Sequence, residues 1–245
     1  MDNTDRLKSY FKGVKGIIFD YGGTLDTGGD HWSWVIREAW DEAGVKTDLP
    51  VFREAYVFGE RELARALHIL PHHDFHDLLK IKIRIELQWL SEQGEFPAAQ
   101  IEPMADRIAS ICNSKAEASI KAATPVLEEL SKKYPLVLVS NFYGNISTVL
   151  EKYGIRRYFK KIIESAVVGI RKPDPEIFTL GVKALELDAS ECLVVGDSYK
   201  KDILPAEKAG CKAVWIKGKG WTEQEDLQEY KAVIKNLGEL TEILG

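Results

Sequence analysis

Short, continuously apolar runs recur along the chain, and most of them end at a polar residue. The clearest occupy residues 16–20 (GIIFD), 136–140 (LVLVS), 192–196 (CLVVG) and 213–216 (AVWI), and Ile162-Ile163 indicates a short additional strand. Runs of this length without a polar face are typical of strands that are buried on both sides of a sheet.

Segments with helical spacing separate these runs. Apolar residues recur at intervals of three and four over residues 144–153, 174–187 and 199–209. The second segment opens with Asp174-Pro175-Glu176, a helix-capping residue followed by proline in the first turn. Strands and helices in alternation predict an α/β fold, with a Rossmann-like core built on a parallel sheet.

The middle of the chain, from about residue 30 to 122, has helical spacing but no β-branched strand run. The expected helices are 34–43, 52–70, 74–90 and 104–120. The insertion is entered through Thr27-Gly28-Gly29 and left through Ala123-Thr124-Pro125, two joints that we expect to be flexible or kinked. We therefore predict an α/β core domain of residues 1–26 and 124–245, and a helical cap domain of residues 27–123.

The charge balance bears on the partners of the chain. It has 33 Lys and Arg against 38 Asp and Glu, a formal net charge of −5 and a pI of about 5.7. This leaves no basic excess of the kind that draws a protein to nucleic acid or to an anionic membrane, so neither is an expected partner. A protein partner stays open.

The N-terminal 15 residues alternate charged and single apolar residues, which is not the pattern of a secretory signal. The cytoplasm is therefore the expected location. The three cysteines, Cys112, Cys192 and Cys211, contain no C-x-x-C pair. An odd, scattered set predicts free thiols rather than a disulfide framework or a zinc site.

Polar residues at three predicted strand ends point to a reaction centre. Asp20, Ser140 and Asp197 follow separate strands, and the carboxyl ends of parallel strands meet at one edge of the sheet. Carboxylate oxygens suit Mg²⁺, and a hydroxyl can donate to a phosphate oxygen. Lys172, just ahead of a predicted helix, can add a fixed positive charge. The combination predicts a magnesium-assisted phosphate site.

At these residues the sequence resembles the haloacid dehalogenase (HAD) superfamily, mostly magnesium-dependent phosphatases with an aspartate nucleophile. The segment 20–25 (DYGGTL) is similar to the first motif of that family, Ser140-Asn141 to the second, 172–175 (KPDP) to the third and 196–202 (GDSYKKD) to the fourth. The four occur in the family order and span nearly the whole chain. The helical insertion between the first and second motifs resembles the cap of the subfamily in which helices close over the site.

The resemblance implies a role for each matched residue. Asp20 would be the nucleophile that attacks phosphorus. Thr24, Ser140 and Lys172 would hold and neutralise the transferring group, and Asn141 would orient the substrate. The implied substrate is a small phosphorylated metabolite.

The resemblance also implies a magnesium site. The metal would lie between Asp20 and Asp197, Asp202 would support the metal or Lys172, and the main-chain carbonyl of Gly22 would be a further ligand. A carboxylate beside a divalent cation and a lysine stays ionised and nucleophilic at neutral pH.

Gly22 departs from the family pattern. Phosphatases of the family usually carry a second Asp two residues after the nucleophile, which protonates the leaving group and then activates water. Glycine can do neither, and a general acid or base is typically worth about 10² to 10⁴ in rate. The loss should be largest for alkyl phosphates and small for acyl or aryl phosphates, whose leaving groups are already stable.

Several groups could supply the proton that Gly22 cannot. Tyr21 is expected to point away from Asp20 because side chains alternate along a strand. Asp26 can reach the site from the following loop, although a turn-stabilising role is favoured, and a cap residue or the substrate itself can also supply the proton.

Other activities are open as well. Related enzymes with a nonacidic residue at this place cleave phosphonates, using a cap lysine as a Schiff base, or carbon–halogen bonds. Lys46 is one of several cap lysines, none of which aligns to that role. The acidic pair Asp197 and Asp202 makes dehalogenation less attractive. The alternative from another class is a catalytically weak protein that binds a phosphorylated ligand or a protein partner.

The cap carries three further patterns, each with a plain structural interpretation. The histidines 68, 72, 73 and 76 are expected to form a polar face rather than a metal site. Trp32, Trp34 and Trp40 should pack the cap, with Trp32 or Trp34 as possible pocket residues. The basic residues Arg53, Arg61, Arg65 and those of 80–84 have acidic neighbours, which favours a solvated helical face.

Overall fold

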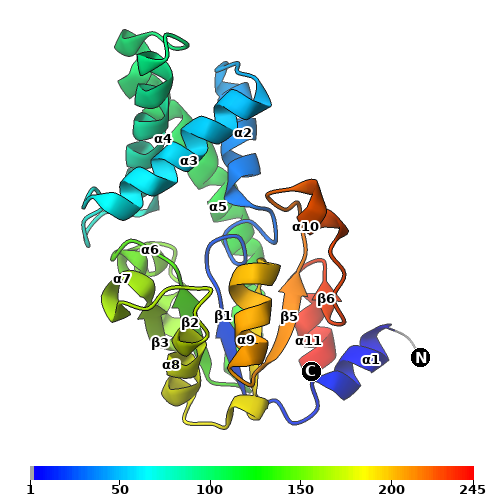
Figure 1. The fold of residues 1–245 in the computed structure, drawn as a ribbon. Coiled ribbons are helices and arrows are strands. Elements are labelled where there is room, and N and C mark those ends of the chain that lie inside the picture. Colours follow the sequence, from blue (N-terminus) through cyan, green and yellow to red (C-terminus); the bar gives the residue numbers. More distant parts are fainter. Residues whose placement is uncertain (1–2) are drawn as a thin grey trace.

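A computed structural model of the chain describes residues 3–245 (Figure 1). A six-stranded sheet forms its core, in the order β3-β2-β1-β4-β5-β6, and every neighbouring pair is parallel. The strands are β1 (Gly16–Phe19), β2 (Leu136–Ser140), β3 (Phe159–Glu164), β4 (Cys192–Gly196), β5 (Lys212–Ile216) and β6 (Val233–Ile234). The predicted α/β class and parallel sheet are confirmed.

Both faces of the sheet are covered, which explains why its strands are continuously apolar. Ile17 and Phe19 belong to one buried cluster and Ile18 to another, since successive side chains of a strand point to opposite faces. Helices α1, α5, α6 and α11 contribute to the first cluster, and α8 and α9 to the second.

The helices of the core alternate with the strands, as the sequence predicts. They are α1 (Asn3–Tyr10), α6 (Ile146–Lys152), α7 (Ser165–Val168), α8 (Glu176–Leu185), α9 (Leu204–Lys208), α10 (Glu223–Leu227) and α11 (Glu239–Leu244). The expected helix 199–209 is a π-helical turn, Tyr199–Ile203, followed by α9. The edge strand β6 and the full length of β3 were not expected, because the apolar run at β6 is only three residues long (232–234) and Lys160 and Lys161 interrupt β3.

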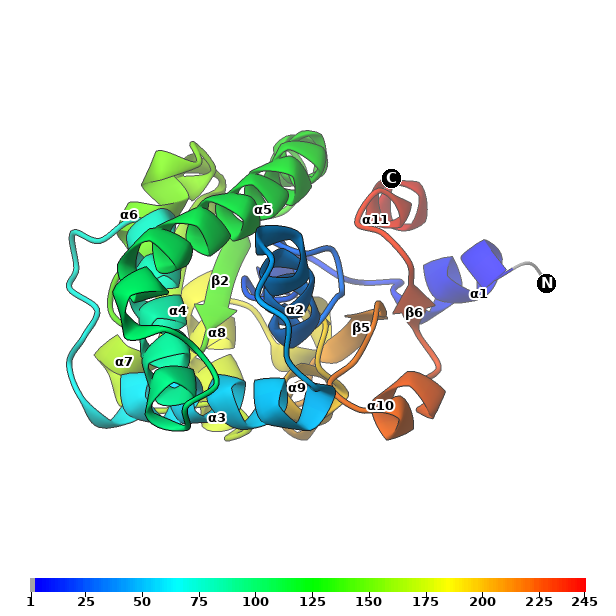
Figure 2. The ribbon, with the colours of Figure 1, turned by 90° about the horizontal axis from the view of Figure 1, so that it is seen from above.

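The helical insertion lies between β1 and β2, as expected. It comprises α2 (Trp32–Ala43), α3 (Leu49–Arg65), α4 (Phe75–Glu92) and the first part of α5 (Ile101–Ser131). Viewed from above, α4 lies between α3 and α5, and α2 packs beside α5 (Figure 2). The division of the domains at residues 26 and 124 stays a prediction.

Helix α5 differs from the expectation of a joint at residues 123–125. It is a single helix of 31 residues that runs through Pro125 and joins the cap to the core. Proline in a helix interior costs about 3 kcal/mol, but buried residues on either side, among them Ala123 and Leu127, pack the helix in place. Tertiary packing here outweighs the local preference.

The cap contacts the core on two sides of the strand ends. On one side the indole of Trp34 donates to the carbonyl of Gly220 (2.6 Å), and Arg53 donates to that of Trp221 (3.0 Å). On the other side the amide of Asn145 donates to the carbonyl of His73 (2.9 Å). The space between cap and core is thereby bounded on both sides.

Two further expectations concern the chain as a whole. Within residues 3–245, none of the helices combines the length and apolar character needed to cross a membrane. Cys112, Cys192 and Cys211 are free and buried, as predicted.

Candidate active site

A cavity of about 400 Å³ lies between the cap and the carboxyl ends of the strands. Most of the residues singled out in the sequence line it, namely Asp20, Gly22, Ser140, Asn141, Lys172, Asp197 and Asp202. They come together because β1 is in register with both β2 and β4, so that the residues following these strands are neighbours. Thr24 is fully buried and is not one of the lining residues.

Lys172 lies between two carboxylates on the core wall of this cavity. Its Nζ is 2.7 Å from Oδ1 of Asp20 and 2.7 Å from Oδ1 of Asp202, and all three residues are buried. Burial alone lowers the pKa of Lys172, but the two carboxylates more than reverse this, so its pKa is raised. The lysine is therefore held in its charged form at the predicted reaction centre.

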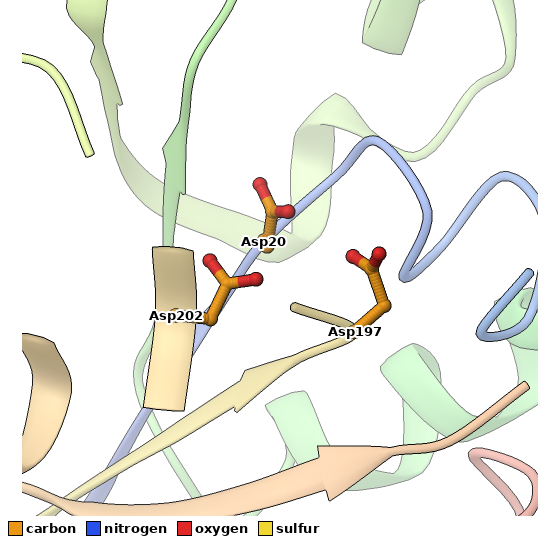
Figure 3. A group of neighbouring side chains, drawn as sticks. All are labelled: Asp20, Asp197 and Asp202. Atoms are coloured by element: carbon orange, nitrogen blue, oxygen red, sulfur yellow. The ribbon is translucent and has the colours of Figure 1, made fainter. Parts of the chain in front are cut away.

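Asp197 completes a cluster of three carboxylates. One oxygen each of Asp20, Asp197 and Asp202 lie within 4.8 Å of one another, and Figure 3 shows the three side chains gathered from separate segments. Burial, reinforced by the neighbouring Asp202 and Asp20, raises the pKa of Asp197 well above its usual value. Crowded carboxylate oxygens with only one lysine between two of them are a donor set that fits Mg²⁺.

The loop after β1 is shaped to bring Asp197 close. Gly23 has a positive φ of 92°, and a Cβ there would lie 2.3 Å from Oδ2 of Asp197, so only glycine fits. The hydroxyl of Thr24 donates to Oδ1 of Asp197 (2.9 Å). In this structure Thr24 positions a carboxylate of the cluster.

The second motif, at Asn141, holds the backbone of the third motif, at Lys172. Asn141 donates from Nδ2 to the carbonyl of Lys172 (3.1 Å) and accepts from the Lys172 N–H at Oδ1 (2.9 Å). The start of α6 is capped by Glu164, which accepts from the N–H groups of Gly144 and Ile146.

Gly22 lies in open space at the wall of the cavity. No atom lies within 4 Å of a Cβ built on it, and its φ is not in the left-handed region. A side chain at this position would fit without displacing a neighbour.

Asp26 and Tyr21 are both engaged elsewhere. Asp26 lines the cavity but accepts from the Gly23 N–H (2.7 Å) and the Trp32 indole (3.0 Å), which is the turn-stabilising role. Burial raises its pKa to about 8, although these two hydrogen bonds oppose the shift. Tyr21 packs edge-on against Phe75 and Phe142.

A second buried lysine lies on the cap wall of the cavity, and the sequence did not reveal it. Lys82 of α4 is only 3% exposed, with its Nζ 2.6 Å from Oε1 of Glu60 and 3.1 Å from Oε1 of Glu86. The interpretation of residues 80–84 as a solvated face is wrong at this position. The available signal was the spacing, since Lys82 and Glu86 fall on the same helical stripe as the buried Leu79 and Ile83.

The other cap patterns follow their structural interpretations. His68 pairs with Glu62, His73 accepts from the Leu70 N–H and His76 pairs with Ser110. Trp40 packs against Phe52 inside the cap.

Trp32 lines the cavity, whereas Trp34 contacts the core loop near Gly220. Lys46 is exposed and paired with Asp41 away from the cavity lining.

Comparison with known proteins supports the fold and the motifs. A family model described as a haloacid dehalogenase-like hydrolase matches residues 14–210. The chain is 32% identical to a phosphoglycolate phosphatase of Vibrio cholerae over 212 residues, which are 82% of this chain and 83% of that protein.

Two further similarities are partial or mainly structural. A glyceraldehyde 3-phosphate phosphatase of Pyrococcus abyssi is 38% identical over 122 residues, 45% of this chain, and the chain spans only about half (51%) of that relative. A 2-haloacid dehalogenase structure from Pseudomonas syringae pv. Tomato is 25% identical with a TM-score of 0.52, over 94% of this chain and 98% of that one. With the four motifs gathered at one edge of the sheet and the cap between the first two, the chain belongs to the haloacid dehalogenase-like hydrolases.

Proposed function

We propose that the chain is a magnesium-dependent phosphohydrolase that acts on a small phosphorylated metabolite through an aspartyl-phosphate at Asp20. The observation that carries the proposal is the core wall of the cavity. There a buried lysine is paired with Asp20, and Asp197 and Asp202 complete a carboxylate cluster suited to Mg²⁺.

Asp20 is the proposed nucleophile. One of its oxygens forms a bond to phosphorus while the bond from phosphorus to the leaving oxygen breaks, and the leaving oxygen takes a proton. Water then attacks the aspartyl-phosphate, releasing inorganic phosphate and restoring the carboxylate. Lys172 and Ser140 neutralise and hold the phosphoryl oxygens, which is the main demand of phosphoryl transfer.

The magnesium ion would be held by Asp20, Asp197, Asp202 and the carbonyl of Gly22. It would supply positive charge to the transferring phosphoryl group. Asn141 fixes the backbone of Lys172 through its two hydrogen bonds. Thr24 steadies Asp197.

The source of the proton is the feature that distinguishes this chain from the family pattern. Gly22 stands where the family usually has an acid, and the engaged oxygens of Asp26 leave that carboxyl as a turn residue. We therefore propose a preference for leaving groups that need little protonation or that carry their own proton donor.

The names of the relatives support a small substrate. The Vibrio cholerae and Pyrococcus abyssi proteins are named for phosphoglycolate and glyceraldehyde 3-phosphate. A cavity of about 400 Å³ is of the size that holds such molecules.

The other activities are less well supported by the cavity. A Schiff base needs a neutral amine, whereas the pKa of Lys82, lowered by burial alone, is raised well above its usual value by Glu60 and Glu86. Dehalogenation makes no use of the carboxylate cluster formed with Asp197 and Asp202.

Phosphate release with Mg²⁺ from acyl, aryl and sugar phosphates and from a phosphonate tests the proposal. Asp20→Asn should lower turnover by about 10³-fold or more, whereas Asp5→Asn, at an exposed position of α1, should match the parent. Intact-mass measurement during turnover should show one added phosphoryl group on the parent only. Magnesium binding without phosphate release from any substrate would replace this proposal with the ligand-binding alternative.

A further inference from the structure

The cap wall of the cavity holds a cluster of ion-paired side chains, one of which is partly exposed. Lys82 on α4 contacts Glu60 from α3 and Glu86 one turn further along α4. Its ammonium also lies 4.1 Å from the centre of the Tyr56 ring, within the range of a cation–π contact. The ammonium donates a hydrogen bond to Oε1 of Glu60. Lys82 is therefore a residue that positions Glu60.

Glu60 is the member of this cluster that can bind something else. It lines the cavity and its side chain is 36% exposed, against 0% for Glu86. Oε1 is taken by Lys82, and the hydroxyl of Tyr143 lies 3.4 Å from Oε2, a long hydrogen bond. A carboxylate has about four acceptor positions, so Glu60 retains spare acceptor capacity toward the cavity.

The charge state of Glu60 is set by its neighbours. Burial alone raises the pKa of Glu60, but Lys82, with smaller contributions from Lys201 and His31, more than reverses this and lowers it. Glu60 thus presents a fixed negative charge in the cap wall. Such a group attracts hydrogen-bond donors and repels a carboxylate.

Apart from Lys82, whose ammonium is paired with Glu60 and Glu86, the lysines and the arginine that line the cavity come from the core. Arg171, Lys200 and Lys201 lie in the segments that carry Lys172 and Asp202. Most of the positive charge of the cavity is therefore on the side of the proposed phosphoryl site. Glu60 on the cap, flanked by the aromatic rings of Tyr56 and Tyr143, faces the rest of the substrate.

We infer that Glu60 is the specificity-determining residue of the cavity and accepts a hydrogen bond from a hydroxyl or amino group on the leaving group, disfavouring leaving groups that end in a carboxylate. This inference rests on the proposed phosphohydrolase function. It predicts that phosphorylated polyols or amino alcohols are better substrates than phosphorylated acids of similar size.

The test compares kcat/KM for four esters with Mg²⁺. Glycerol 3-phosphate offers hydroxyl groups, phosphoethanolamine offers an amine, phosphoglycolate ends in a carboxylate, and p-nitrophenyl phosphate lacks a hydrogen-bond donor and reports on the core chemistry alone. The parent should prefer one of the first two over phosphoglycolate. Which of the two it prefers separates hydroxyl from amine recognition.

Glu60→Gln should then lower kcat/KM for the preferred ester by about 10- to 100-fold, the usual value of a hydrogen bond to a charged group. The same variant should raise kcat/KM for phosphoglycolate and change that for p-nitrophenyl phosphate less than about threefold, which also shows that it is folded. Glu60→Asp, which keeps the charge, should recover part of the loss. Glu54→Gln, exposed on the same helix, should match the parent.

Two results would overturn the inference by different routes. If p-nitrophenyl phosphate is cleaved but phosphoglycolate is preferred, or Glu60→Gln affects all esters equally, the role of Glu60 is wrong while the proposed function stands. If the parent cleaves none of the four, the proposed function is wrong and this inference with it.

Discussion

The two walls of the cavity carry the same motif built in different ways. On the core wall Lys172 lies 2.7 Å from Asp20 and 2.7 Å from Asp202, and on the cap wall Lys82 lies 2.6 Å from Glu60 and 3.1 Å from Glu86. The core wall adds a third carboxylate, Asp197. An aromatic ring lies near both lysines, closer to Lys82 (Tyr56, 4.1 Å) than to Lys172 (Phe178, 5.6 Å). We propose a metal site on the first wall and a charged recognition group on the second.

The difference shows how each element type concentrates charge. Parallel strands deliver residues from distant parts of the sequence to one edge, so Asp20 meets Asp197 and Asp202 although it lies far from them in the chain. A helix pair delivers only what adjacent turns carry, here one i,i+4 pair and one residue from the neighbouring helix. The core wall is therefore suited to the proposed phosphoryl transfer, and the cap wall to selecting which substrate binds.

Gly22→Asp should have the largest effect, because it adds to the core wall the acid whose place we propose that Gly22 occupies. No atom lies within 4 Å of the new Cβ, so the side chain should fit. Turnover of an alkyl phosphate such as glycerol 3-phosphate should rise by about 10² to 10⁴, whereas that of acetyl phosphate should change little. Steady-state phosphate release measures both, and an unchanged ratio would mean that another group already supplies the proton.

Lys172→Met tests whether the core lysine acts on every substrate. Removing one group that stabilises the transferring charge costs about 10² to 10³ in kcat, and the loss should be similar for all phosphate esters. Lys183→Met, an exposed position on α8, is the matched control. A loss confined to one ester would contradict the proposed division of roles between the walls, because Lys172 would then contribute to substrate selection.

Lys82→Met tests the opposite expectation for the cap. It leaves the buried Glu86 and the partly exposed Glu60 without their cation, and breaking a buried ion pair costs about 3 to 5 kcal/mol. The free energy of unfolding, measured with urea, should fall accordingly. Lys80→Met, whose exposed partner is Asp106, should cost less than about 1 kcal/mol. Equal stability of the two variants would show that the cluster is not essential to the cap.

The contrast between the walls also explains what the sequence could predict. The core strands and the residues after them follow from apolar runs and from motifs whose spacing the sheet imposes, so Asp20, Asn141, Lys172 and Asp197 were placed correctly at one cavity. The location of Thr24 behind Asp197 depends on the turn at Gly23, which no pattern specifies.

The cap was harder to predict for a physical reason. Charged residues on a helix are usually solvated, so the stripe that Lys82 shares with Leu79 and Ile83 was outweighed, and the packing of α3 against α4 buries Lys82 while Lys80 stays exposed. Pro125 indicated a joint by its local preference, but the packing of α5 against both cap and core overrides it.

Glu86→Gln should have the smallest effect. It tests whether Glu60 carries the negative charge of the cap cluster while Glu86 keeps its proton. Burial raises the pKa of Glu86 to about 7, although Lys82 opposes the shift, whereas the pKa of Glu60 is lowered. The folded chain therefore retains a proton on Glu86 between about pH 4.5 and 7, where the unfolded chain has released it. Its contribution to stability is greatest below this window and is lost as the pH rises toward 7.

Glutamine cannot ionise, so Glu86→Gln should lack this slope. Relative to the parent, the variant should gain up to about 3 kcal/mol in unfolding free energy between pH 5 and pH 8, at about 1.4 kcal/mol per pKa unit. Urea unfolding at the two pH values measures the gain, with Glu92→Gln, exposed at the end of the same helix, as control. Parallel pH profiles of parent and variant would mean that Glu86 is ionised throughout, with Lys82 shared equally between two carboxylates as Lys172 is on the core wall.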